Sequence, residues 1–181
     1  ISDMYRRKAL VFEEQDSLAA AIAYFRRSLE ILKARPGNVR DVSRNYQGLA
    51  RCFILQGALE QAESFNQEDF ALLTDNFGAD YSMLAHTYLT AGQLKYQQGQ
   101  LNEAIAQYQL SLEKSAPAFK ALHWSDLPQA EDFEYIPPVL STLQAKAEAL
   151  IRLGVQPSDG MRYLQAAYDT YFLAIELIDV L

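Results

Sequence analysis

The stretch that decides the fold is residues 92–112, GQLKYQQGQLNEAIAQYQLSL. Apolar and small side chains recur at intervals of three and four residues on both sides of Gly99, which is the spacing of amphipathic helices. A glycine between two such runs fits a helix end, because glycine adopts the left-handed backbone conformation at little cost. The stretch therefore predicts two antiparallel helices joined by a short turn.

The same unit occurs twice more, nearer the N-terminus. A turn residue, an apolar residue two positions later and an alanine three positions after that recur at spacings of 41 and 42 residues. The matching sets are Asp16, Leu18 and Ala21; Gly57, Leu59 and Ala62; and Gly99, Leu101 and Ala104. Aromatic-rich helical stretches precede the turns, at residues 5–12, 46–53 and 88–96. We expect the alanines to mark the close contact between the two helices of each hairpin, because only small side chains permit it.

A second amphipathic helix follows each turn. Its apolar stripe carries two large residues, which are Phe25 and Leu29, then Phe65 and Phe70, then Tyr108 and Leu112. Asn38 and Asp41, after Pro36 and Gly37, indicate a helix start with a capping residue and an acid three positions on. Residues 1–117 are thus predicted to form three helical hairpins.

The periodicity lapses at residues 118–137, a proline- and aromatic-rich linker that ends at Pro137, the first of two adjacent prolines. A fourth helical pair is predicted for residues 138–181. Its first helix closes at Gly154, a loop occupies residues 155–160, and the last helix repeats the second-helix pattern with Leu164, Ala167, Tyr171 and Ile175. Because residue 1 is isoleucine and the chain ends in an apolar helix, we expect a piece of a longer protein with a further C-terminal domain.

Composition limits the classes of function. The 181 residues carry a net charge of −7, which disfavours nucleic acid as a partner because that binding needs clustered positive charge. No apolar run approaches the length of about 20 residues that spans a membrane. One cysteine and two histidines are too few for a Cys/His zinc site, so we expect no metal and no cofactor. The single Cys52 favours a reducing, cytoplasmic compartment.

The third hairpin resembles a known repeat family. Gly92, Gly99, Ala104, Tyr108 and Leu112 match the tetratricopeptide repeat, whose pattern places a small residue, a turn glycine, an alanine, an aromatic and a leucine at these offsets. The family period is about 34 residues, and the longer period here is similar to the kinesin-light-chain type. The resemblance implies an all-α fold, a right-handed superhelix of antiparallel helical hairpins (a TPR-like α-solenoid) with about four helix pairs.

The C-terminal quarter carries a second resemblance. Residues 143–150 (LQAKAEAL), 163–167 (YLQAA) and 174–178 (AIELI) are similar to the helical pair that precedes the caspase-like CHAT peptidase domain in bacterial tetratricopeptide proteins. The proline-rich linker before them fits the same arrangement. This resemblance implies a peptidase domain beyond residue 181, with no catalytic residues in the present segment.

The repeat resemblance also implies a binding surface. In a tetratricopeptide superhelix the first helix of each pair lines a concave groove, and separated arginines, amides and an aromatic there suit an extended peptide. The alternative is a groove that is simply hydrated or filled by the protein's own chain. The candidate peptide-binding residues are Arg6, Arg7, Arg44, Gln47, Arg51, His86, Gln93, Tyr96, Gln97, Gln144, Glu148 and Arg152.

Other reactive residues favour structural roles. Cys52 could act as a nucleophile with His86 as its base, but its apolar neighbours favour a small buried hydrophobe. His123 beside Trp124 favours packing in the linker. The acidic residues at 126–134 lack the spacing of a calcium loop, so a solvated loop is favoured; they are Asp126, Glu131, Asp132 and Glu134.

The sequence therefore predicts a protein- or peptide-binding scaffold without catalysis of its own, the sensor or regulatory region of a larger bacterial CHAT-type peptidase. Two alternatives stay open. One is a stand-alone enzyme built on helical repeats, which would need a converged catalytic set. The other is a structural oligomerisation module.

Overall fold

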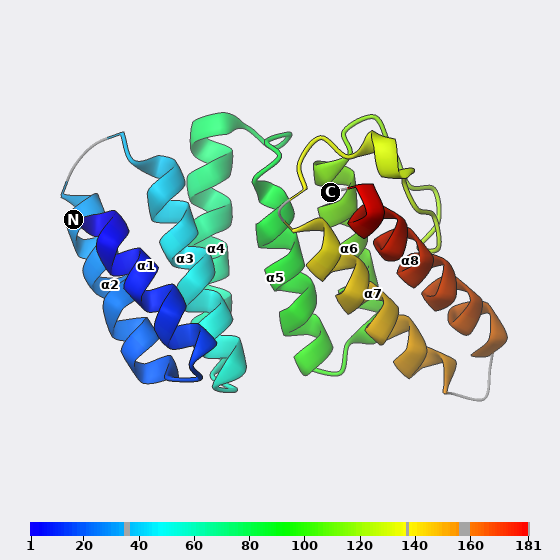
Figure 1. Cartoon of the computed structure of the whole chain (residues 1–181), viewed down its shortest axis with the longest axis horizontal. Coiled ribbons are helices and arrows are strands. Elements are labelled where there is room, and N and C mark those ends of the chain that lie inside the picture. Colours follow the sequence, from blue (N-terminus) through cyan, green and yellow to red (C-terminus); the bar gives the residue numbers. More distant parts are fainter. Residues whose placement is uncertain (35–36, 137, 156–159, 181) are drawn as a thin grey trace. The chain divides into compact units, whose positions relative to one another are not determined.

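The computed structural model describes residues 1–34, 37–136, 138–155 and 160–180, with residues 179 and 180 described as backbone only. Within these residues all regular structure is helical (Figure 1). The elements are α1 (Ser2–Glu14), α2 (Leu18–Lys33), α3 (Val39–Leu55), α4 (Leu59–Phe77), α5 (Leu84–Gln97), α6 (Leu101–Ser115), the short 3-10 turn η1 (Ala130–Asp132), α7 (Val139–Gly154) and α8 (Gly160–Val180). The prediction of an all-α fold built from four helical hairpins is confirmed. Among the described residues, no helix is both long enough and apolar enough to cross a membrane.

The three predicted turns share one backbone motif. Asp16, Gly57 and Gly99 have positive φ angles of 57°, 73° and 77°. In each turn the next amide reaches back five residues to a carbonyl, which is the hydrogen bond of a Schellman motif. These bonds are Ser17 N to Phe12 O (2.8 Å), Ala58 N to Phe53 O (2.9 Å) and Gln100 N to Lys95 O (2.9 Å). Asp16 therefore replaces glycine in the same conformation, which aspartate tolerates better than most side chains.

Small residues lie at the predicted close contacts. Ala21, Ala62 and Ala104 are fully buried. The facing first helices also place a small residue at equivalent positions, and these are Ala9, Ala50, Gly92 and Ala147. A Cβ at Gly92 would lie 2.3 Å from Cε1 of Tyr108, so this glycine is required by space.

The chain folds as two compact units, Ile1–Tyr81 and Ser82–Leu181. In the first unit, hairpins α1–α2 and α3–α4 are joined by the packing of α3 on α2. Gly48 of α3 makes this possible, since a Cβ there would lie 2.4 Å from Cζ of the fully buried Phe25. The second unit contains α5 to α8 and the linker.

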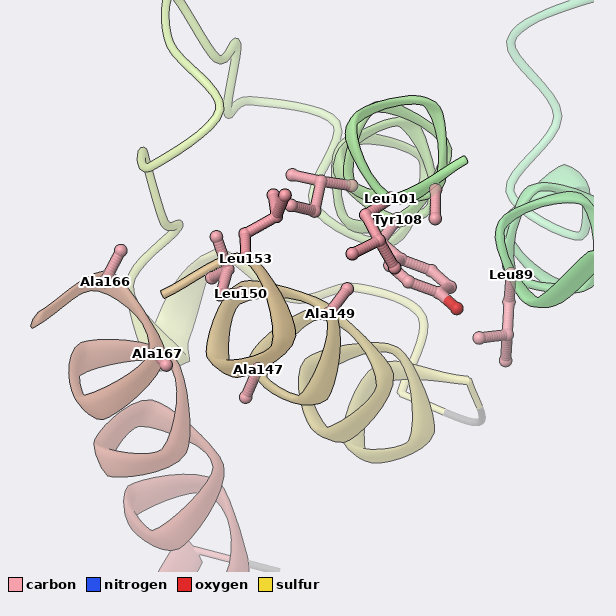
Figure 2. Close-up of a cluster of buried hydrophobic side chains, with 11 residues drawn as sticks. Leu89, Leu101, Tyr108, Ala147, Ala149, Leu150, Leu153, Ala166 and Ala167 are labelled. Atoms are coloured by element: carbon pink, nitrogen blue, oxygen red, sulfur yellow. The ribbon is translucent and has the colours of Figure 1, made fainter. Parts of the chain in front are cut away.

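In the second unit, α7 packs on α6 as α3 packs on α2. Figure 2 shows Ala149 and Leu150 of α7 pointing toward α6, whereas Ala147 points away from it on the side of α8. The linker belongs to this core, because Phe133 is buried beside Leu112 and Trp124 packs on the neighbouring cluster. The division into domains 1–117, 118–137 and 138–181 stays a prediction.

One apolar assignment on a second helix is wrong, and on another second helix part of the predicted apolar stripe is exposed. Phe70 is 38% exposed, and the buried position of its turn is Asp69, which is 1% exposed. In α8, Leu164 and Ile175 are 42% and 58% exposed although Ala167 is buried. In the second case the repeat pattern holds, but among the described residues no further helix packs on this side of α8.

One helix-end prediction also needs correction. α3 begins after Asn38 as predicted, but the Asn38 side chain makes no capping hydrogen bond, and Asp41 instead accepts one from Arg44. α7 ends at Gly154 as predicted, and this glycine does not adopt a left-handed conformation. What requires glycine there is space, since a Cβ would lie 2.9 Å from Cγ of Leu164. Pro36, Pro137 and loop residues 156–159 of the predictions lie outside the described residues, as does Leu181.

We expect Gly48→Ala to destabilise the protein by about 1–3 kcal/mol in thermal or urea unfolding, because Phe25 is enclosed and cannot retreat from the new methyl group. The gain in helix propensity, about 1 kcal/mol, is too small to offset this. In the double variant Gly48→Ala with Phe25→Leu, the total loss should be smaller than the sum of the two single losses. Unchanged stability in Gly48→Ala would contradict the packing of α3 on α2.

Candidate functional site

The predicted binding residues fall on two faces, one in each unit. In the first unit α1 contacts α3, and in the second unit α5 contacts α7, so the first helices are neighbours within each unit. The α1/α3 face carries Arg6, Arg7, Arg44, Gln47 and Arg51. The α5/α7 face carries His86, Gln93, Tyr96, Gln97, Gln144, Glu148 and Arg152.

Arg51 on the α1/α3 face is engaged in a structural ion pair. Its Nε and Nη2 donate to Oε1 and Oε2 of Glu13 at 2.5 and 2.7 Å, so one bidentate pair joins α3 to α1. The Glu13 side chain is only 12% exposed. Burial by itself would lower the pKa of Arg51, but the hydrogen bond and charge of Glu13 outweigh it and the pKa is raised. Arg51 is therefore occupied by its own fold.

Of the other arginines of this face, Arg7 and Arg44 are exposed and Arg6 is half-buried. Arg6 and Arg7 both bind the carboxylate of Asp3, at 2.7 and 2.8 Å, and their hydrogen bonds hold its pKa below the usual value. Arg44 binds Asp41 at 2.9 Å. Exposed pairs of this kind are weak, so a ligand carboxylate can replace the internal one at little cost.

Gln47 lies inside the α3/α4 hairpin. It is 9% exposed, and its Nε2 donates to Asp69 Oδ2 at 3.0 Å and to Ser43 Oγ at 3.1 Å. Its amide is thus occupied within the first unit and does not face a ligand. No pattern in the sequence indicated this pair, because the predicted apolar stripe of α4 assigned the buried position to Phe70, whereas Asp69 occupies it.

The α5/α7 face keeps most of its predicted residues accessible. The guanidinium of Arg152 lies over the ring of Tyr96, with 5.2 Å between its Cζ and the ring centroid. Gln144 Nε2 donates to Glu148 Oε1 at 3.0 Å. Gln97, Gln144, Glu148 and Arg152 are exposed, and Gln93 and Tyr96 are half-buried. This face therefore presents amides, an aromatic ring and both signs of charge on two adjacent helices.

The histidines and the cysteine lie apart from this chemistry. The half-buried His86 ring meets Tyr135 of the linker edge-on, with 5.9 Å between centroids. Cys52 is fully buried, and burial raises the pKa of its thiol from 9.0 to about 12. The thiol is therefore protonated near neutral pH and is a poor nucleophile, as the sequence predicted. His123 is exposed.

The acidic linker residues bind their own backbone. Asp126 Oδ2 accepts hydrogen bonds from the amides of Leu122 and His123 at 2.8 and 2.9 Å, which lowers the pKa of Asp126. Asp132 Oδ2 accepts one from the amide of Gln129 at 2.8 Å. Over the described residues, no group of three His, Cys, Asp or Glu side chains could hold a metal ion.

A buried lysine is the feature that sequence reasoning missed. Lys146 of α7 is 0% exposed, and its Nζ donates to Gln109 Oε1 at 2.5 Å and to the Asp126 carbonyl at 3.2 Å. It thereby joins α7, α6 and the linker. Burial lowers the pKa of Lys146 from 10.5 to about 7, and the charge of Asp126 opposes this only in part. The sequence did contain one indication of this burial, because Lys146 lies four residues from both Thr142 and Leu150 on one side of the helix.

Comparison with known proteins supports the repeat assignment. Residues 1–75, which contain nearly all of the first two hairpins, match a family model described as tetratricopeptide repeat. The crystal structure of BtubC (BKLC) from P. vanneervenii shares the fold, with a TM-score of 0.65 and 16% sequence identity over 99% of this chain. The chain spans 63% of the length of that protein. Among curated proteins no sequence matches this chain.

We expect Arg51→Ala to lower the free energy of unfolding by about 2 kcal/mol, because it leaves the enclosed Glu13 carboxylate without its bidentate partner. Arg44→Ala on the same helix should change it by less than about 0.5 kcal/mol, since its ion pair is exposed. Urea denaturation of both variants measures this. Equal losses would mean that the Glu13–Arg51 pair has no special structural role.

Lys146 should make stability depend on pH. Above about pH 7 the folded chain releases the Lys146 proton while the unfolded chain keeps it, so the unfolded state binds more protons and stability rises with pH. We expect the free energy of unfolding to rise between about pH 6.5 and 8.5, by up to roughly 1.4 kcal/mol per pH unit. Above about pH 9 the raised pKa of Cys52 acts in the opposite direction, because the unfolded thiol ionises first.

Urea denaturation at several pH values compares the wild type with Lys146→Met, whose slope should be flatter. The exposed Lys120 provides the matched control, and Lys120→Met should keep the wild-type slope. A slope unchanged in Lys146→Met would show that this ammonium titrates normally.

Proposed function

We propose that the chain is a scaffold that binds a protein or peptide along its first-helix faces. The tetratricopeptide match of residues 1–75 and the shared hairpin fold support a role in protein interaction. We place the main binding site on the α5/α7 face, because Arg152 lies over Tyr96 there, beside exposed amides on two adjacent helices.

The chemistry of the two faces suits an extended peptide with an acidic side chain or a terminal carboxylate. Gln93, Gln97 and Gln144 can donate to and accept from a peptide backbone. Arg152 is preorganised by its contact with Tyr96 and can bind a carboxylate with two parallel hydrogen bonds. On the α1/α3 face, Arg7 and Arg44 can exchange their exposed internal partners for ligand carboxylates.

Within this proposal, the chain is the sensor or regulatory region of a larger bacterial peptidase of the CHAT type in the cytoplasm. The support is the resemblance of residues 143–150, 163–167 and 174–178 to the helical pair that precedes such domains. Peptide binding on the α5/α7 face would then be the input to the peptidase. The coding sequence after residue 181 tests this part, because a domain with catalytic histidine and cysteine motifs must follow.

Peptide selection tests the binding function. A random peptide library displayed on phage is selected on the 181-residue protein, and the enriched peptides are measured by fluorescence polarisation. We expect acidic sequences to be enriched, and Arg152→Ala to weaken them at least tenfold, since a desolvated charge-assisted hydrogen bond contributes roughly 1.5–3 kcal/mol. Tyr96→Ala should weaken them as well, because it removes the surface that orients Arg152.

The controls remove positive charge elsewhere. Lys120→Ala removes one exposed charge in the same unit, and Arg26→Ala with Arg27→Ala removes two from the outer surface of α2. These variants should bind within about twofold of the wild type. Losses as large as that of Arg152→Ala would reject the α5/α7 face, and the absence of any enriched peptide would reject peptide binding.

A further inference from the structure

The helix α8 has a second apolar face on which no other α-helix of the described residues packs. Its buried side is formed by Ala166, Ala167, Thr170, Leu173 and Leu177. A separate set of large apolar side chains, exposed by 42–81%, recurs every three or four residues along α8. We call this set the α8 stripe, and it consists of Met161, Leu164, Tyr168, Phe172, Ile175 and Ile178.

The α8 stripe occupies positions that are covered in other hairpins. When the helices are aligned on Ala21, Ala104 and Ala167, three of its residues and Tyr171 match apolar residues of α2 and α6. The matches to Leu164, Tyr168, Tyr171 and Ile175 are Leu18, Ile22, Phe25 and Leu29 in α2, and Leu101, Ile105, Tyr108 and Leu112 in α6. All but Leu18 are buried, and α2 and α6 pack against the next first helices, α3 and α7. The stripe is therefore shaped to receive a first helix.

The first helix of the chain has the complementary face. Ile1, Met4, Lys8 and Val11 are exposed along α1 and its N-cap, and we call them the α1 stripe. The same positions are Val42, Asn45, Leu49 and Cys52 in α3, and Val139, Thr142, Lys146 and Ala149 in α7. All eight are buried, in the two first helices that pack on α2 and α6. An open groove of about 600 Å³ beside Tyr24 adjoins the α1 stripe.

Charge favours the pairing of these two stripes. In the alignment of first helices, Lys8 of α1 corresponds to Lys146 of α7, whose ammonium binds Gln109 of α6. In the alignment of second helices, Gln109 corresponds to Phe172 of α8. In the same register Lys8 would lie at the level of Phe172, with Asp169 and Glu176 within one turn on either side. Both carboxylates belong to exposed residues, so Lys8 would meet opposite charge on both sides.

The area is sufficient for a specific contact. Six side chains of about 200 Å² each, a little over half exposed, give roughly 700 Å² on the α8 stripe, close to the ~800 Å² per partner of a standard interface.

We propose that two copies of this chain associate head to tail, with the α8 stripe of one copy packed on the α1 stripe of the next in the register of α6 on α7. The occupant of the α8 stripe is thus a second copy, and the contact repeats a helix pairing that the chain already forms internally. Because the two stripes differ, the interface is heterologous. Each copy can therefore make two contacts, one through its α8 stripe and one through its α1 stripe. This inference does not depend on peptide binding.

Sedimentation velocity of the 181-residue protein, over concentrations from low micromolar to near millimolar, tests the proposal. Ile175→Glu blocks the α8 stripe, and Met4→Glu with Val11→Glu blocks the α1 stripe; all three positions are exposed, so the fold should be kept. We expect the wild type to gain mass with concentration and each blocked variant to associate at least tenfold more weakly. An equimolar mixture of the two blocked variants should form a dimer, because one intact pair of stripes remains between them.

Ala23→Glu adds the same charge at an exposed position of α2 and should associate like the wild type. A wild type that stays monomeric, or a mixture that stays monomeric, overturns the proposal. If the variant blocked at the α1 stripe associates alone as well as the wild type does, the contact is between two α8 stripes and the head-to-tail arrangement is wrong. Arg152→Ala should leave association unchanged, so loss of peptide binding and loss of this contact are separate results.

Discussion

The close approach of helices at small residues is the constraint on which the rest of the structure depends. Where Ala104 is fully buried, or where a Cβ at Gly48 would meet the Phe25 ring at 2.4 Å, two helices come near enough for large side chains on either side to interlock. Such packing fixes both the rotation and the register of each helix. The shared turns at Asp16, Gly57 and Gly99 then start each second helix in the same orientation.

A fixed register assigns a role to every face of every helix. In α3 and α7, one side packs within the hairpin and another side packs on the preceding second helix, which leaves a third side for polar residues. Arg152 and Tyr96 meet on that remaining side because α5 and α7 are neighbours. The same logic explains why the α8 stripe is apolar, since five of its six positions correspond to buried residues of α6, the helix that packs on α7.

Buried polar groups add specificity to this apolar framework. Lys146 binds Gln109 and the Asp126 carbonyl, and Gln47 binds Asp69, so each ties together elements that packing alone could let slide. A buried ammonium or carboxylate is costly unless its hydrogen bonds are made, which penalises any other register. The Glu13–Arg51 pair does the same between α1 and α3 at a more exposed site.

The sequence by itself determined the helices, the three turns and the close contacts at alanine, because period, turn conformation and side-chain size act locally and repeat. It also identified which helices carry the exposed amides and arginines. Only the tertiary structure decided which of those side chains are available: Arg51 and Gln47 are engaged by Glu13 and Asp69, residues 38 and 22 positions away along the chain. It likewise decided that Ile175 is exposed while its counterpart Leu112 is buried. Both outcomes depend on the side chains that a neighbouring helix supplies, and the pattern within one helix does not indicate which side chains those are.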